Sequence, residues 1–206
     1  MRGAVGRLLR VAWHVFPMVP TLYGYHAGFN AAPVLRVLWP LAALWTTGEV
    51  VRLCISPKIN RLLCRAAGTL LRPAEHQKPT GSCYYLWGVI STIYLFGDIN
   101  LDAAVAGLLC LCLADPAAAV VGQVLGRWRG PPLRSGKSVG GFVAAWVVAT
   151  IAVTLHAHHL RDGRKASCWA APFVGLCAAT AESFSSPLDD NFLIPLASAA
   201  CASRWL

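Results

Sequence analysis

The chain has 206 residues, of which 56% are hydrophobic and only 13% are charged. Soluble domains carry roughly 25% charged residues, so this deficit excludes an ordinary soluble protein and predicts one embedded in a membrane. The net charge of +9 lies mostly in short segments between apolar runs, where basic residues orient membrane helices or bind phosphate groups. No basic stripe is interleaved with aromatic residues, so we predict no binding to nucleic acid. The length predicts a single domain over residues 1–206.

Apolar runs long enough to cross a bilayer follow one another along the chain, and they predict an all-α, polytopic transmembrane bundle of about seven spans. The runs cover residues 11–28, 34–54, 82–97, 101–124, 139–158, 168–184 and 191–205. Between the second and third runs, residues 55–81 interleave basic residues with leucines. This pattern predicts an amphipathic helix at the membrane surface that leads into a loop.

The distribution of lysine and arginine predicts how the bundle is oriented. Thirteen of these residues lie on the side that holds the N-terminus, the 55–81 segment and the 126–138 and 184–190 loops, and five lie on the other side. Cytosolic loops carry the excess of positive charge in membrane proteins. We therefore predict a cytosolic N-terminus, although the basic segment 161–165 runs against the rule.

Asp115 is an acidic residue within the fourth apolar run, and Pro116 interrupts the helical hydrogen bonding beside it. A carboxylate at this depth is costly unless a cation accompanies it, so such residues are functional candidates by default. We interpret Asp115 as a metal ligand or a general base. The alternative is a carboxylate that an interhelical partner neutralises.

A glycine-rich basic segment follows, composed of Gly122, Gly126, Gly136, Lys137, Ser138, Gly140 and Gly141. Glycine lets backbone N–H groups approach phosphate oxygens, while Lys137 adds a charge and Ser138 a hydroxyl. A helix that begins just after Ser138 would direct its positive dipole end to the same point. The segment resembles the end of a P-loop, but the glycine spacing and the absence of a preceding strand exclude that motif. The alternative is a flexible basic loop.

Further acids lie at the last predicted turn of the bundle. Glu182 ends the sixth run, and Asp189, Asp190 and Asn191 open the seventh. Helix capping would explain one acid at such a position. Two acids and an amide that face Glu182 across a short turn predict a site for a hard cation such as Mg²⁺.

Two more pairs complete the candidates. Glu75 and Lys78 precede the third run, where Lys78 is either a phosphate contact or a lysine that extends to the membrane interface. Arg10 and His14 are four residues apart and therefore share one helix face. A histidine in such a place is more often a hydrogen-bonded packing residue than a catalyst.

Taken in order, these segments resemble the membrane lipid kinases that use CTP. That family includes CTP-dependent diacylglycerol, dolichol and phytol kinases, and it is similar to the CTP-binding part of phosphatidate cytidylyltransferase. The resemblance rests on Arg10…His14, Arg72-Pro73-Ala74-Glu75, Lys78-Pro79-Thr80-Gly81-Ser82-Cys83-Tyr84-Tyr85-Leu86-Trp87-Gly88, Asp115-Pro116-Ala117-Ala118…Gly122…Gly126, Gly136-Lys137-Ser138-Val139-Gly140-Gly141, Glu182 and Asp189-Asp190-Asn191-Phe192-Leu193-Ile194-Pro195. The diacylglycerol kinase branch is the most similar. Val11 stands where the family has a lysine, so Arg10 would act alone.

The resemblance implies CTP as phosphate donor, a divalent cation (Mg²⁺ or Ca²⁺) and a membrane alcohol as acceptor, foremost diacylglycerol. It further implies an integral protein of the endoplasmic reticulum or nuclear envelope with its active face in the cytosol. We predict catalytic roles for Asp115, Lys137 and Asp190. The predicted nucleotide contacts are Arg10, Lys78, Gly122, Gly126, Gly136, Lys137, Ser138 and Gly140. The predicted metal ligands are Asp115, Glu182, Asp189, Asp190 and Asn191, with Glu75 and His14 as further site residues.

Three other functions remain open at this point. The enzymatic ones are cytidylyl transfer to phosphatidate, with attack at the α-phosphorus, and phosphorylation of dolichol or phytol. A transporter or a membrane scaffold is the non-enzymatic one, since intramembrane acids and broken helices occur in transporters too. The sequence shows no inverted repeat, and its acidic and basic motifs gather on one face rather than at the midplane.

Overall fold

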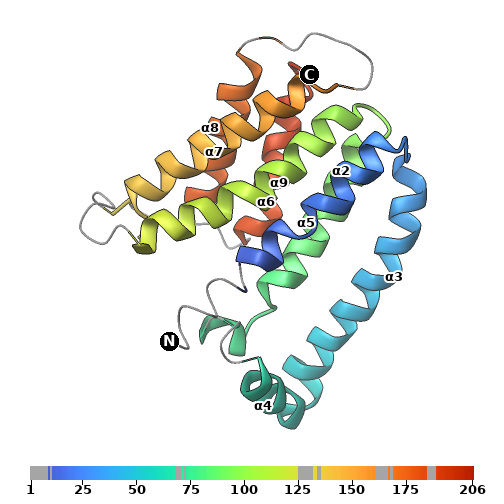
Figure 1. Ribbon diagram of the computed structural model, residues 1–206. Helices are drawn as coiled ribbons and strands as arrows, with labels where there is room; N and C mark the ends of the chain where they lie inside the picture. Colours follow the sequence, from blue (N-terminus) through green and yellow to red (C-terminus); the bar gives the residue numbers. More distant parts are fainter. Residues whose placement is uncertain are drawn as a thin grey trace.

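The computed structural model describes residues 9, 11–67, 71, 73–124, 132–133, 136–160, 167, 169–184 and 189–206 (Figure 1). Over these residues the chain is helical and contains no strand, with one isolated bridge between Pro132 and Ser138. The α-helices are α2 (Met18–His26), α3 (Ala31–Val50), α4 (Pro57–Ala66), α5 (Gly81–Phe96), α6 (Leu101–Val124), α7 (Val139–Ala157), α8 (Ala170–Ser183) and α9 (Asp190–Ala202). The all-α prediction is confirmed for this part of the chain.

Three helical segments are long and apolar enough to cross a membrane. They are Ala31–Ile55, Leu101–Gly122 and Val139–Ala157, with 25, 22 and 19 residues. They correspond to the second, fourth and fifth predicted runs, and they support an integral membrane protein. Helices α8 and α9 have only 14 and 13 residues, shorter than the roughly 20 that a straight span needs. Helix α9 is shorter than the corresponding apolar run because residues 203–205 form a turn.

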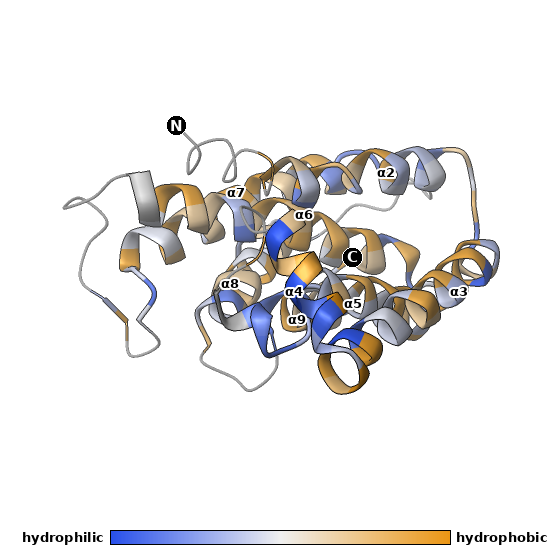
Figure 2. Ribbon diagram, turned by 90° about the horizontal axis from the view of Figure 1, so that it is seen from below, coloured by the Kyte–Doolittle hydropathy of each residue, from blue (hydrophilic) through white to orange (hydrophobic). Residues whose placement is uncertain are grey.

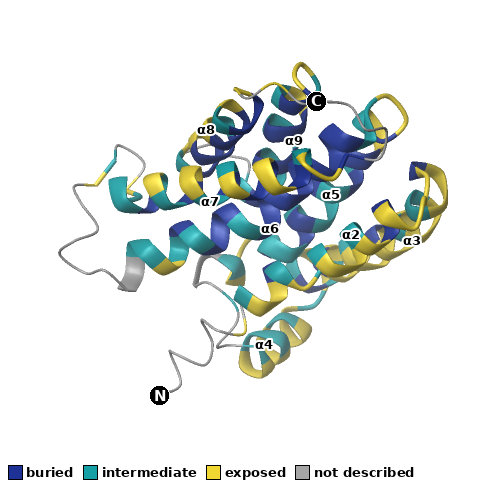
Figure 3. Cartoon of the chain, turned by 45° about the horizontal axis from the view of Figure 1, so that its top comes forward, coloured by how far each residue is buried: buried dark blue, intermediate teal, exposed yellow. Residues whose placement is uncertain are grey.

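Helix α6 forms the centre of the bundle, where it packs against α2, α5, α7, α8 and α9. Its most apolar stretch is 72% buried. The side chains in this core are mostly small, which lets the helix backbones approach closely. In Figure 3 the buried residues concentrate on α6 and α9, whereas α3 and α4 are largely exposed. The middle of the molecule is therefore rigidly packed around the helix that carries Asp115.

Helix α3 stands apart from this core. It packs mainly against α5, and its most apolar stretch is only 11% buried. Large apolar side chains such as Val37, Trp39 and Leu44 are exposed along it. Figure 2 shows the apolar character of this helix. Apolar surface of this extent marks a face that contacts lipid or another protein, and it agrees with a membrane-spanning helix.

The amphipathic helix predicted within residues 55–81 is present as α4. Ser56 caps its N-terminus by accepting a hydrogen bond from the Ile59 backbone N–H at 3.4 Å, and Pro57 occupies its first position. A π-helical turn over Val51–Ile55 joins α3 to α4, and a 3₁₀ turn over Pro73–His76 precedes α5. Of the other described residues of this segment, 67, 71 and 77–80 are not helical. Its location at a membrane surface stays a prediction.

Close contact between α6 and α9 depends on Gly107. A Cβ atom at this position would lie 2.4 Å from the Pro195 carbonyl oxygen and 2.9 Å from the Ala199 Cβ. We expect Gly107→Ala to destabilise the protein by about 1–3 kcal/mol, because the extra carbon overpacks the core. Thermal unfolding in detergent measures the loss. Gly48→Ala on α3 is the matched control: nothing lies within 4 Å of its new methyl group, so its helix propensity should leave stability equal or higher. Equal melting temperatures for the two variants would contradict this packing.

Candidate active site

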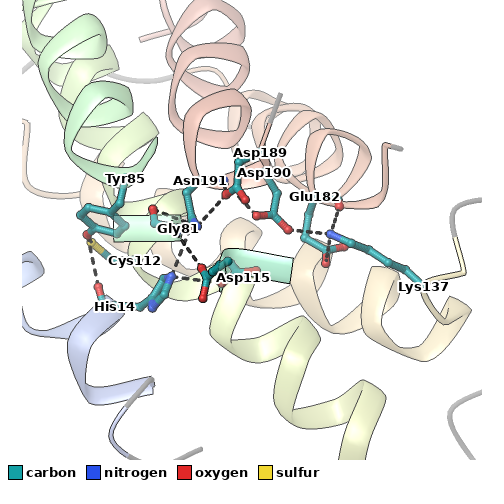
Figure 4. A network of polar contacts seen from close by, with 11 residues as sticks. His14, Gly81, Tyr85, Cys112, Asp115, Lys137, Glu182, Asp189, Asp190 and Asn191 are labelled. Carbon is teal, nitrogen blue, oxygen red and sulfur yellow. Dashed lines mark hydrogen bonds and ion pairs between the residues drawn. The ribbon is translucent and has the colours of Figure 1, made fainter. Parts of the chain in front are cut away.

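One end of the bundle brings together acids from three helices (Figure 4). Asp115 lies on α6, Glu182 near the end of α8 and Asp190 at the start of α9. Ligand oxygens of these three residues all lie within 4.8 Å of one another. Asp115 and Glu182 are only 6% and 5% exposed. These residues, called the three-acid group below, form a buried concentration of negative charge that requires compensation.

Lys137 supplies part of that compensation. Its Nζ atom donates to Glu182 Oε1 at 2.8 Å, to Asp190 Oδ2 at 2.8 Å and to the Glu182 backbone carbonyl. An ammonium group has three N–H donors, so these contacts account for all of them. Burial lowers the pKa of Lys137, but Asp190 and Glu182 raise it, and the net pKa lies above its ordinary value of 10.5. Lys137 is therefore charged at neutral pH, and the stability that its charge contributes is lost as the pH rises through that raised pKa.

Helix termini converge on the same place. Helix α7 begins directly after Ser138, as predicted, and the Ser138 Oγ accepts a hydrogen bond from the Gly141 N–H at 3.1 Å. Asp189 caps α9 in the same way by accepting from the Asn191 N–H at 3.1 Å. The positive ends of two helix dipoles thus point toward the three-acid group, and both would favour an anionic ligand beside it.

His14 links the N-terminal part of the chain to this centre. Its Nε2 atom lies 3.0 Å from Asn191 Oδ1 and 3.4 Å from Asp115 Oδ2. The Asn191 amide nitrogen donates to Asp189 Oδ1 at 2.8 Å and to the Gly81 carbonyl at 3.5 Å, and both of these only accept. The amide oxygen must therefore face His14, so the Nε2 atom carries a hydrogen. In this arrangement the Nε2–H of His14 donates to Asn191, and Asp115 lies beside the same nitrogen atom.

Tyr85 packs against His14. Its hydroxyl lies 3.3 Å from the His14 carbonyl oxygen and 3.1 Å from Cys112 Sγ, and the two rings meet edge to face at 5.5 Å. Tyr85 itself is 8% exposed. This contact fixes the backbone of His14 against α5 and α6. Periodicity and motif spacing gave no indication of this role.

Two glycines of the predicted segment, Gly122 and Gly141, lie against Ser138. A Cβ atom on Gly122 would lie 3.2 Å from the Ser138 Oγ. Gly136 has a φ of 80°, a left-handed turn that favours glycine, and Gly140 lies in the first turn of α7. Gly126, and likewise Arg10, lies outside the described residues.

The remaining candidates include two residues that precede α5 and two at the start of α9. Glu75 Oε1 accepts a hydrogen bond from the Gly81 N–H at 2.7 Å, at the N-terminus of α5. Lys78 has an exposed side chain, and its backbone carbonyl accepts from Arg52 at 2.6 Å. Asp189 and Asn191 use the contacts given above to cap α9 and to hold His14. The structure groups Asp115, Glu182 and Asp190 within reach of one ion, and the ligand roles of Asp189 and Asn191 stay a prediction.

The donor set fits a hard divalent cation. Magnesium and calcium both prefer carboxylate oxygens, and three such groups are within reach of a single ion. The ammonium of Lys137 already shows that positive charge is stable between Glu182 and Asp190. No cysteine or histidine nitrogen belongs to this group, so the chemistry of its donors favours these ions over zinc.

Comparison with known proteins gives two relatives. The chain is 31% identical to CTP-dependent diacylglycerol kinase 1 of Schizosaccharomyces pombe over 185 residues, which cover 85% of the chain and 81% of the relative. It is 35% identical to the protein of the same name from Eremothecium gossypii over 95 residues, which cover 46% of the chain and 29% of that relative. No family model and no solved structure matches the chain.

The chain belongs to the CTP-dependent diacylglycerol kinase family. One pair of buried charges is not among the site residues predicted from the sequence. Glu49 and Arg52 on α3 and its π-helical turn are 6% and 3% exposed and are joined by a 2.6 Å ion pair. From the sequence, Arg52 is one of the thirteen basic residues whose distribution predicts the orientation of the bundle. Opposite charges three residues apart at the end of an apolar run were the signal available in the sequence.

Proposed function

We propose that this protein transfers the γ-phosphoryl group of CTP to the hydroxyl of diacylglycerol, with phosphatidate and CDP as products. The three-acid group with Lys137 carries the proposal, because phosphoryl transfer depends on charge neutralisation and positioning around the moving phosphorus. Membership in a family whose named members are CTP-dependent diacylglycerol kinases supports the two substrates.

In the proposed reaction the lipid hydroxyl oxygen attacks the γ-phosphorus. A bond forms between that oxygen and the phosphorus, the bond to the oxygen bridging the β- and γ-phosphorus atoms breaks, and its electron pair leaves with CDP. The hydroxyl proton passes to a carboxylate. We assign that role to Asp115, because His14 lies beside it and because the contacts of Lys137 go to the other two acids.

The other residues would bind the nucleotide and a cation. Glu182 and Asp190 would hold a Mg²⁺ or Ca²⁺ ion, which when bound neutralises phosphate charge. The backbone from Ser138 to Gly140 at the start of α7 would face the phosphates. Since all three N–H groups of Lys137 are used by the acids, a phosphate oxygen must replace one of these contacts before Lys137 can bind it.

We further propose that residues 1–206 form one membrane-embedded kinase domain of about seven spans in the endoplasmic reticulum or nuclear envelope. Its active face would be cytosolic, because CTP arrives from the cytosol and most basic residues lie on the same side as the three-acid group. The hydroxyl of diacylglycerol lies at headgroup depth, where it can meet a water-borne nucleotide.

Labelled nucleotides test the reaction. Purified protein is incubated with diacylglycerol micelles and CTP labelled at either the γ- or the α-phosphorus. We expect label in the lipid product only from the γ-position, since only that phosphoryl group moves. Label from the α-position with phosphatidate as acceptor would instead identify a cytidylyltransferase. Parallel assays with dolichol and phytol, and with ATP in place of CTP, establish the acceptor and the donor.

A further inference from the structure

We propose that Glu49, Arg52 and Asn60 form a clamp that positions the 75–81 segment as one wall of the active site. The residues lie at the C-terminal end of α3, in the π-helical turn and on α4, outside the three-acid group. This inference rests on the proposed function, which supplies the activity to be measured. It assigns a positioning role to charged residues that the phosphoryl-transfer chemistry does not use.

Arg52 is the centre of the clamp because its whole guanidinium group is satisfied. Nε and Nη2 donate to Glu49 Oε2 at 2.9 and 2.6 Å. Nη1 donates to Asn60 Oδ1 and to the Glu75 carbonyl, each at 3.0 Å, and Nη2 also donates to the Lys78 carbonyl at 2.6 Å. These five contacts match the five N–H donors of an arginine. A lysine has three donors and no planar fork, so it cannot reproduce them.

Glu49 and Asn60 hold the same segment at other points. The Glu49 carboxylate accepts hydrogen bonds from Thr80 Oγ1 at 2.8 Å and from the Thr80 backbone N–H at 3.2 Å. Asn60 Nδ2 donates to the His76 carbonyl at 2.9 Å. Together with the Arg52 contacts, backbone groups of four residues between 75 and 80 are tied to α3 and α4. The clamp therefore fixes the path of the chain into α5.

A series of contacts connects the 75–81 segment to the three-acid group. Glu75 accepts from the Gly81 N–H, and the Gly81 carbonyl accepts from Asn191, which in turn holds His14. A Cβ atom on Gly81 would lie 3.1 Å from both the Asn191 amide nitrogen and Glu75 Oε1. With so little space around Gly81, a shift of the 75–81 segment must displace Asn191. The displacement would reach Asp115 through His14.

Stability alone does not account for such a pair. A buried ion pair is often no more stabilising than apolar residues of similar volume, although removing one partner leaves an unpaired buried charge at a high cost. The pair also lies next to a π-helical turn, a feature frequent at functional sites. Its contacts go to backbone groups that precede α5, so its effect is on where that segment lies.

Removing both charges together separates positioning from stability. In the double variant Glu49→Gln/Arg52→Met no unpaired charge remains, and we expect a melting temperature close to that of the wild type. We expect kcat/KM for CTP to fall about 100-fold, since small misplacements of reacting groups have effects of this size. The single variant Arg52→Lys, which keeps the positive charge but not the five donors, should also have a lowered kcat/KM. A double variant with wild-type melting temperature and wild-type kcat/KM would overturn the proposal.

A milder pair of variants covers the case in which the double variant does not fold. Asn60→Ala removes two clamp contacts from the partly exposed side, whereas Arg61→Ala alters the neighbouring exposed residue of α4, which is outside the clamp. We expect kcat to fall several-fold for Asn60→Ala only. Equal kcat for both variants would overturn the proposal.

Hydrogen exchange gives a readout that needs no substrate. In Asn60→Ala, amides of residues 76–81 should exchange faster while those of α6 keep their protection. Unchanged exchange of residues 76–81 would contradict the clamp, whatever the protein phosphorylates. Absence of label transfer by the wild type would instead contradict the proposed function.

Discussion

Replacing Asp115 with asparagine is expected to lower kcat for lipid phosphorylation about 1,000-fold while the protein remains folded. The amide has the shape of the carboxylate, and it can keep the position of Asp115 beside His14 Nε2, 3.4 Å away. It cannot accept the proton of the lipid hydroxyl, and it removes one negative charge from the three-acid group. Steady-state transfer of γ-label to diacylglycerol measures the effect, and thermal unfolding in detergent checks the fold.

Asp102 provides the matched control on the same helix. It is 4% exposed, as buried as Asp115, but it lies 13 residues earlier, about 20 Å along α6. Its Oδ1 accepts a 2.5 Å hydrogen bond from the Tyr25 hydroxyl. Asp102→Asn should lower the melting temperature and leave kcat of the folded protein close to the wild-type value. If Asp115→Asn kept wild-type turnover, Asp115 could not be the proton acceptor.

Replacing Lys137 with methionine is expected to lower kcat by about 100- to 1,000-fold, the range seen when one preorganised charge is removed from a transition state. The same change leaves the acids without their ammonium partner. The melting temperature in a chelating buffer should therefore fall. Millimolar Mg²⁺ or Ca²⁺ should restore much of it, because a cation bound by the acids replaces the lost charge.

The cation response is the informative part of this experiment. Lys58→Met changes an exposed lysine of α4 and serves as the control; it should behave like the wild type in activity and in its response to Mg²⁺. A Lys137→Met protein that gains no stability from the cation would show that the three-acid group is not a cation site.

Local patterns in the sequence predicted the helical architecture and the helix termini that carry polar side chains. Helix α7 begins directly after Ser138, as predicted, and Asp189 caps α9, which is the alternative to its predicted role as a metal ligand. The gathering of Asp115, Glu182 and Asp190 followed from placing three loops on one side of a membrane. Each of these inferences needs only the apolar runs and the polar residues within them and at their ends.

Features that depend on particular side-chain directions could not be predicted in this way. Whether Lys137 contacts phosphate or the acids depends on the approach of α8 to the segment before α7, which periodicity does not specify. The donor role of His14 follows only from the contacts of Asn191. The clamp around Arg52 joins two stretches separated by an amphipathic helix, and its backbone acceptors leave no trace in residue identity.

The three-acid group and the residues that contact it come from distant parts of the chain. His14 and Asn191 are separated by 177 positions, Gly81 and Asn191 by 110, and Lys137 and Asp190 by 53. During synthesis, the early helices emerge long before the start of α9 is available to join them. The three-acid group can form only after Asp190 has been translated and α9 has docked against α5 and α6. Under the proposed role of the three-acid group, a nascent chain would be unable to transfer phosphate before α9 has docked.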